Sequence, residues 1–220
     1  MKNLQKFGGI AALYEALAYV VAIVGYLLVM GGVGIVDPVQ KVTSLVDNQA
    51  FIYILNLFTY IVFGLFLVVL ALALYERLKV GSPVLVQIAT AIGLVWACVV
   101  IASGMVANVG MDTVVDLYGQ DPAQAALTWL AIDSVALGLG GAGGEILGGM
   151  WILLASWAAL QAGEFPKALN YLGAAIGVVG LISVVPVLGE LRGLIFGLGQ
   201  IVWFVWLGIV ILRKSPSTAA

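Results

Sequence analysis

Two glutamates lie inside apolar segments of this chain, where an ionisable side chain has no obvious partner. Glu15 follows Phe7 by eight residues, which places it ~12 Å along a helix that begins near the N-terminus. Glu145 precedes Gln161 by 16 residues, or ~24 Å of helix. Inside a membrane span a carboxyl group costs at least ~2.5–3.5 kcal/mol, and such groups hold protons, ions or polar parts of ligands. Both glutamates are therefore candidate ligand- or proton-binding residues.

Small residues surround both glutamates at helical spacing. The stripe of the predicted helix that contains Glu15 otherwise consists of small side chains, namely Ala11, Ala18, Ala22 and Gly25. Glu15 is therefore expected to face other helices rather than lipid, with the Tyr19 hydroxyl one turn further on as a hydrogen-bond partner. Gly141 and Gly149 lie four residues before and after Glu145. Their missing side chains leave room for water, an ion, a ligand group or another backbone.

Gln200 and Asn56 are uncharged polar residues in other apolar segments, and they complete the candidate binding set of Glu145, Glu15, Gln200, Tyr19 and Asn56. The alternative interpretation is structural. Each glutamate is then a neutral acid, hydrogen-bonded to a tyrosine hydroxyl or a backbone carbonyl, because burial favours the uncharged form. The residues alone leave both interpretations open.

The composition is that of an integral membrane protein. Of the 220 residues, 63% are hydrophobic and only 9% are charged, with a mean hydropathy of +1.17. Soluble domains are about 45–50% apolar and about 25% charged, so this chain lacks the polar surface that water requires. No polar stretch is long enough for a separate soluble domain. We expect one transmembrane domain over residues 1–220, with an all-α fold.

Six apolar runs predict six transmembrane helices, at about 8–32, 50–74, 84–108, 137–161, 167–188 and 191–212. The third loop is the longest, and Asp121-Pro122 is a typical helix start, so a short surface helix is expected over about 123–135. The glycines between Gly138 and Gly144 predict a bend before the fourth span. Glycines at regular spacing also predict that the last three spans pack closely.

The nine Lys and Arg residues predict the orientation of the chain. With the N-terminus inside, seven of them face the cytoplasm, and only Lys41 and Arg192 lie outside. Short cytoplasmic loops are enriched in Lys and Arg, so both termini are expected on the cytoplasmic side of a cell (plasma or inner) membrane. Arg192, beside Glu190, is expected to anchor the outer end of the last span.

Short motifs resemble those of a known membrane family. They are Gly8-Gly9-Ile10-Ala11-Ala12-Leu13-Tyr14 in the first span, Trp151-Ile152-Leu153-Leu154 in the fourth, and Gln161-Ala162-Gly163-Glu164-Phe165-Pro166-Lys167-Ala168-Leu169 after it. In these segments the chain resembles the uncharacterised prokaryotic polytopic membrane family labelled domain of unknown function 4386. The resemblance implies a polytopic architecture and a prokaryotic cell membrane. It implies no activity, cofactor or catalytic residue.

Several classes of function lack the residues that they need. The chain has no histidine, so no catalytic residue, metal site or cofactor is predicted, and an enzyme is disfavoured. The sequence has no basic patch, so nucleic-acid binding is not predicted. We expect a protein that lies in the lipid bilayer and binds a small molecule, lipid or cation in an intramembrane cavity, with transport as one outcome. The alternative is a structural or accessory membrane protein that packs against partner proteins and has no soluble ligand.

Overall fold

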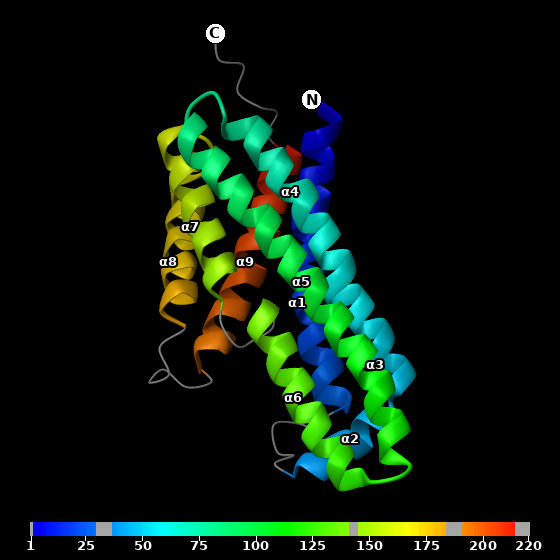
Figure 1. Ribbon diagram of the computed structural model, residues 1–220. Coiled ribbons are helices and arrows are strands. Elements are labelled where there is room, and N and C mark those ends of the chain that lie inside the picture. Colours follow the sequence, from blue (N-terminus) through cyan, green and yellow to red (C-terminus); the bar gives the residue numbers. More distant parts are fainter. Residues whose placement is uncertain (1, 30–36, 141–144, 184–190, 214–220) are drawn as a thin grey trace.

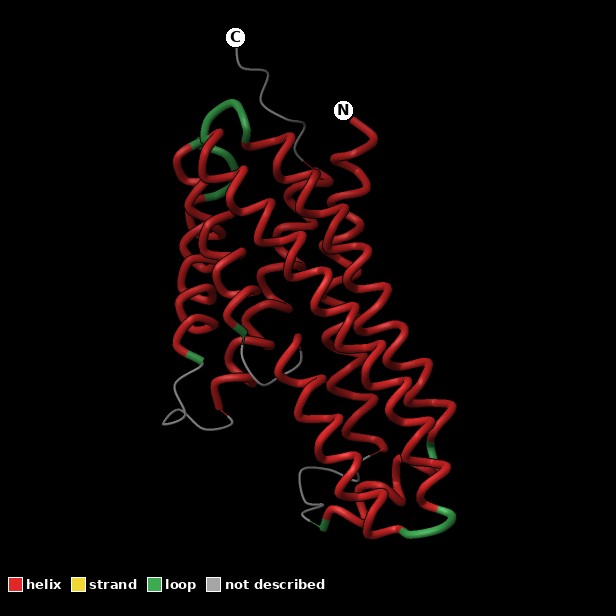
Figure 2. The backbone as a smooth tube through the Cα atoms, viewed as in Figure 1, coloured by secondary structure: helices red, strands yellow, loops and turns green. Residues whose placement is uncertain are grey.

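The computed structural model describes residues 2–29, 37–140, 145–183 and 191–213, and all regular structure in these ranges is helical (Figure 1). Where the structure describes the connection between two helices, it is a short turn (Figure 2). In chain order the elements are α1 (Lys2–Val29), α2 (Pro38–Asp47), α3 (Gln49–Asn56), the π-helix η1 (Leu57–Val62), α4 (Phe63–Leu78), α5 (Pro83–Tyr118), α6 (Pro122–Gly140), α7 (Ile146–Gln161), α8 (Lys167–Ile182) and α9 (Leu191–Arg213). The prediction of an all-α chain is confirmed.

Five helical segments of the described chain are long and apolar enough to cross a membrane. They are Asn3–Val29, the continuous rod Gln49–Leu78, Pro83–Tyr118, Pro122–Gly140 and Ile195–Arg213. α7 and α8 are apolar as well, but each has only 16 residues, or ~24 Å of helix. Length and composition therefore describe a membrane protein with several spans.

The start of α6 is set by a local cap. Asp121 Oδ1 accepts hydrogen bonds from the backbone N–H groups of Ala123 and Gln124, each at 3.0 Å. Pro122 occupies the first helical position, where its missing N–H group costs nothing. The predicted helix start at Asp121-Pro122 is therefore confirmed.

The end of α6 and the start of α7 differ from the prediction. α6 continues to Gly140 instead of ending near 135, and α7 begins at Ile146 instead of near 137. The last turns of α6 are held against α5, because Ser103 Oγ donates a hydrogen bond of 2.6 Å to the Ala136 carbonyl. A Cβ atom at Gly140 would lie only 2.9 Å from Val100 Cα, so glycine permits this approach. Tertiary contacts thus extend α6 beyond its expected length.

α6 and α7 follow one another in the same direction along α5 (Figure 1). α6 lies with α2 and the end of α5 at the end of the molecule that is far from the start of α1. A separate small core fills this end, made of Val42, Leu45, Ile52, Met111, Val114, Ala125 and Ala126. We call α2, α6 and the last turns of α5 the end cap. The helix that was expected on the surface, α6, is therefore part of this end cap.

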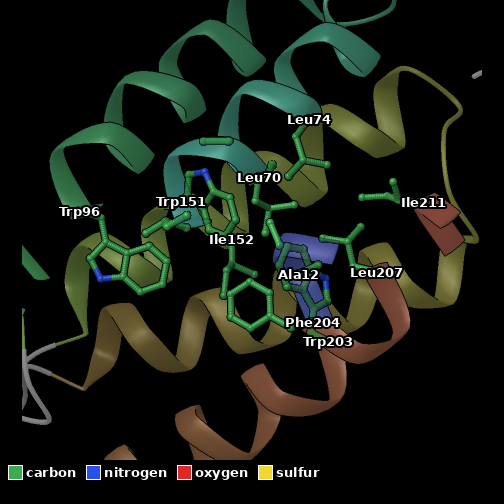
Figure 3. Packing of buried hydrophobic residues seen from close by; sticks show 14 of the residues in the cluster. Ala12, Leu70, Leu74, Trp96, Trp151, Ile152, Trp203, Phe204, Leu207 and Ile211 are labelled. Carbon is green, nitrogen blue, oxygen red and sulfur yellow. The ribbon is translucent and has the colours of Figure 1, made fainter. Parts of the chain in front are cut away.

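The larger core lies between α1, α4, α5, α7, α8 and α9. Large rings dominate it, and Figure 3 shows Trp151, Trp203 and Phe204 close together inside it. Three of its largest side chains, Trp151, Phe196 and Phe204, are at most 1% exposed. This packed bundle positions the candidate polar residues.

α7 and α8 approach each other closely at glycines. A Cβ atom at Gly149 would lie 2.8 Å from the Gly177 carbonyl oxygen and 2.9 Å from Gly180 Cα. Larger side chains separate α8 from α9, where a Cβ atom at Gly180 would meet the Phe196 ring at 2.6 Å. The predicted close packing is therefore confirmed for α7 and α8, and side chains fill the space towards α9.

Candidate functional site

Glu15 lies on the face of α1 that the other helices cover. It is 0% exposed, as are Ala11 and Ala12 one turn before it. The prediction that Glu15 faces helices rather than lipid is confirmed. Neither carboxyl oxygen has a hydrogen-bond partner among the described residues, so the expected bond to Tyr19 is not formed. An unpartnered carboxyl group in an apolar interior is stable only as a neutral acid or with a bound cation.

Gln200 approaches the same interior from α9. It is 0% exposed, and neither its amide oxygen nor its amide nitrogen has a partner among the described residues. α1 and α9 pack against each other, with Gly9 beside Leu212 near the start of one helix and the end of the other. This antiparallel register places Gln200 within about two turns of Glu15 along the bundle, or ~10 Å.

Five aromatic side chains from five helices contact one another in a closed circuit. The ring centroids of Tyr19 and Phe63 are 5.7 Å apart, those of Phe63 and Trp96 5.9 Å, and those of Trp96 and Trp151 5.6 Å. Phe204 closes the circuit at 6.3 Å from Trp151 and 6.4 Å from Tyr19. These separations are typical of favourable ring pairs. Tyr19 therefore packs as a member of this aromatic circuit.

Glu145 is placed immediately before α7 and is partly exposed. Its backbone N–H group donates a hydrogen bond of 3.1 Å to Ser183 Oγ at the end of α8. On the side of α7, neighbouring helices occupy the space beside the glycines, and another backbone is one of the expected occupants. A Cβ atom at Gly148 would meet the Trp96 ring at 2.8 Å, and the backbone of α8 occupies the space beside Gly149. Neighbouring helices have filled the gaps that glycine leaves.

Some predicted residues lie outside the described part of the chain. Gly141 and Gly144, on the other side of Glu145, belong to this group, as do Glu190 and the side chain of Arg192. The expected anchoring role of Arg192 therefore stays a prediction.

Asn56 belongs to a hydrogen-bonded network that joins three helices. Its side-chain oxygen accepts from the Tyr26 hydroxyl of α1, and its amide nitrogen donates to Asn108 Oδ1 of α5 at 2.8 Å. Asn108 Nδ2 in turn donates to the Tyr53 carbonyl at 3.4 Å. Asn56 is 1% exposed, so this network supplies the partners that a buried amide needs. Its geometry favours a structural role over ligand binding.

The rod that carries Asn56 becomes π-helical over Leu57–Val62. Thr59 Oγ1 donates to the Leu55 carbonyl at 2.8 Å within this stretch. Tyr14 of α1 donates its hydroxyl proton to the Phe58 carbonyl at 2.7 Å, which ties α1 to the irregular turn. π-Helical turns occur frequently at functional sites, and this one lies against the helix that carries Glu15.

A small cavity lies between α4, α7, α8 and α9, with a volume of about 10 Å³. Its polar lining consists of Ser156, Asn170 and Trp203. Ser156 Oγ and Trp203 Nε1 have no hydrogen-bond partner among the described residues. Both atoms also lie against Gly173 of α8, where a Cβ atom would collide with each of them. A cavity of this size accommodates one water molecule.

Arg77 of α4 contacts the turn between α7 and α8. The Arg77 side chain is 1% exposed, and its Nε atom lies 3.0 Å from Glu164 Oε2. The guanidinium carbon also lies 4.8 Å from the centroid of the Phe165 ring, a cation–π contact. Phe165 has a backbone φ of 61°, which for a bulky residue costs about 1–2 kcal/mol. Asn170 Nδ2 completes the turn by donating to the Glu164 carbonyl at 3.0 Å.

Sequence reasoning missed the cavity and the Arg77 contacts. Arg77 and Glu164 are 87 positions apart, so no local pattern pairs them. The one available signal was the stretch Gly163 to Pro166, which marks a helix end and restart. Ser156 and Trp203 are ordinary in a membrane interior until the fold turns both towards the same cavity.

Among the described residues, the interior contains the unpartnered acid Glu15 and the unpartnered amide of Gln200. Glu15 and Gln200 offer oxygen atoms that can hold a proton or a small cation. Within the described residues, no group of three or more His, Cys, Asp or Glu side chains could hold a metal ion. Any bound cation would therefore depend on few protein ligands.

An all-helical fold with five described segments long and apolar enough to cross a membrane fits a multi-pass membrane protein. The chain matches the family described as domain of unknown function (DUF4386) over residues 10–210, so it belongs to that family. The predicted resemblance is thereby confirmed. No curated protein and no solved structure matches the chain.

Proposed function

We propose that this protein binds a proton or a small cation at an intramembrane site formed by Glu15 and Gln200. The observation that carries the proposal is the Glu15 carboxyl group, which is 0% exposed and has no partner for either oxygen among the described residues. Such a group is unfavourable for packing alone, because an apolar residue would fill the position without its desolvation cost. Transport of the bound ion, with Glu145 as a second acidic position nearer the other surface, is the activity that this arrangement favours.

The same proposal includes six spans in a prokaryotic cell membrane, with both termini in the cytoplasm. The start of α1 and the end of α9 lie at the same end of the molecule, which supports an even number of crossings (Figure 1). The end cap then lies outside the bilayer. The chain returns to the cytoplasmic side through α6 and α7, which together count as one crossing beside α5. The charge distribution supports the orientation, since the cap carries Asp37, Asp47, Asp112, Asp116 and Asp121 with Lys41.

The test compares purified wild-type protein with Glu15→Gln in detergent. Thermal unfolding is measured in Na⁺, K⁺ or Li⁺ against a bulky organic cation at equal ionic strength. A bound cation whose free concentration is 100 times its dissociation constant stabilises the folded state by about 2.7 kcal/mol. Such a stabilisation shifts Tm by several degrees. We expect such a shift, or a dependence of Tm on pH, in the wild type and neither in Glu15→Gln. Glu76→Gln is the matched control, because Glu76 is outside the interior and pairs with Lys79.

Proteoliposomes give the second measurement. A K⁺ diffusion potential is imposed, and proton or Na⁺ entry is followed by a dye or an isotope. The ion-binding proposal is wrong if wild type and Glu15→Gln respond identically to every cation and to pH in the unfolding assay. A cation response in the unfolding assay without ion entry into the proteoliposomes would show that the protein binds an ion but does not transport it.

The second candidate is a structural or accessory membrane protein. The closed aromatic circuit favours it, because Tyr19, Phe63, Trp96, Trp151 and Phe204 fill the bundle where a ligand passage would run. An accessory protein requires no ion response, so the unfolding measurement separates the two candidates.

A further inference from the structure

One partly exposed side chain lines the cavity beside Ser156. Nine described residues line it, and eight of them are buried, whereas Phe165 is partly exposed. Phe165 therefore has one side towards the cavity and another towards the end of the molecule where α7 and α8 meet. Removing its ring would open the cavity at that end.

The backbone at Phe165 indicates that the ring is needed. A φ of 61° favours glycine, and the chain does use glycine two positions earlier, at Gly163 with a φ of 64°. The Phe165 ring is held in place from the other side by the Arg77 guanidinium at 4.8 Å, and Arg77 is itself fixed by Glu164 at 3.0 Å. A strained residue that is fixed by its neighbours is typical of a functional position.

The polar atoms of the cavity point to water as its occupant. Trp203 Nε1 donates only, whereas Ser156 Oγ donates and accepts, so one water molecule can accept from the indole and bond to the hydroxyl. Both side chains are at most 3% exposed. Trp203 follows Gln200 by one helical turn on α9, so the cavity begins about one turn from Gln200 towards the end of α9.

We propose that this cavity is a buried water site and that Phe165, held by the Arg77–Glu164 pair, is the plug that separates it from the cytoplasm. The role of the site as an access route to Glu15 and Gln200, and the cytoplasmic side of the plug, rest on the proposed function; the closure of the cavity by Phe165 does not. Phe165→Gly removes the ring and suits the backbone conformation, so it should open the cavity without disturbing the turn.

The experiment measures the reactivity of a cysteine placed in the cavity. Ser156→Cys is made in a Cys98→Ala background, because Cys98 is exposed. Inside-out vesicles are treated with a small charged thiol reagent, with and without Phe165→Gly. We expect labelling to be at least tenfold faster with Phe165→Gly, and to remain slow with Phe165→Leu, which keeps an apolar plug.

Two controls keep the outcome specific. Ser103→Cys is buried near the end cap, far along α5 from the turn, and its labelling should not change with Phe165→Gly. If Ser156→Cys does not fold, Ala159→Cys reports on the same cavity, since Ala159 lines it and is 1% exposed. Equal labelling rates with Phe165 and with Phe165→Gly would overturn the plug, and so would an equal increase at Ser103→Cys. The assay uses no ion gradient, so a failed ion-binding test leaves its result unaffected.

Discussion

Glu15 is both buried and ionisable, and these two properties oppose each other in an apolar interior. The Asn56 amide is equally buried, but Tyr26 and Asn108 satisfy it, so its position needs no ligand. Glu15 and Gln200 have no such partners among the described residues. Buried polar groups without partners are rare in folded proteins, and each indicates an ion, a water molecule or a functional role. This contrast separates the structural polar residues from the candidate functional ones.

Replacing Glu15 by methionine should therefore raise stability or leave it unchanged. Methionine has a similar length and no desolvation cost, and removing an unpartnered polar group recovers about 1–3 kcal/mol. Thermal unfolding of Glu15→Met in detergent, at a pH where no cation response is seen, measures this change. Asn56→Leu is the contrasting variant and should destabilise, since it leaves Tyr26 and Asn108 without their partner. A loss of stability in Glu15→Met equal to that in Asn56→Leu would show that Glu15 is a structural residue.

The helices of the second half are positioned by glycines with different functions. Gly149 allows the backbones of α7 and α8 to touch, and Gly140 allows the end of α6 to lie on α5. Gly138 has no atom within 4 Å of an added Cβ, so packing does not require glycine there. In a membrane, close backbone approach of this kind is a main source of helix association.

Alanine substitutions should distinguish these positions. Gly149→Ala places a methyl group 2.8 Å from the Gly177 carbonyl oxygen, so α7 and α8 must separate, and we expect a loss of about 1–3 kcal/mol. Gly138→Ala should be neutral or stabilising by up to about 1 kcal/mol, because alanine is the better helix former. Unfolding by a denaturing detergent at fixed lipid content compares the two. Equal effects at both positions would contradict the α7–α8 contact.

On the scale of the whole molecule, two cores are arranged along one axis. The larger core lies between the long helices, and the smaller one joins the α2, α5 and α6 segments of the end cap to α3. α5 has 36 residues, or ~54 Å, so it is much longer than the hydrocarbon core of ~30 Å. An untilted α5 would therefore extend beyond the bilayer at one end, and we propose that this end is the cap with its acidic residues, on the outside.

Accessible cysteines should report this arrangement in intact cells. In the Cys98→Ala background, Gln120→Cys in the cap should react with a membrane-impermeant thiol reagent, whereas Val80→Cys in the turn between α4 and α5 should not. Both native residues are exposed, so burial does not protect either position. Permeabilised cells provide the control, since both cysteines should then react. Labelling of Val80→Cys from outside would reverse the proposed orientation.

The sequence by itself determined the class of the protein, its helical fold and its family. Hydropathy and composition are sums over residues, so they do not depend on which helices are neighbours. The start of α6 was also predictable, because the Asp121 cap involves only adjacent residues.

Only the tertiary structure decided which polar residues have partners. Glu15 was expected to bond to Tyr19, yet packing of α1 against α4 and α9 placed the Tyr19 ring between Phe63 and Phe204. Phe165 and Arg77 looked unremarkable until the fold brought together segments nearly 90 positions apart. The direction of a side chain in a bundle depends on the rotation and depth of every neighbouring helix. Those quantities arise from the packing of distant segments and are not encoded in any local pattern.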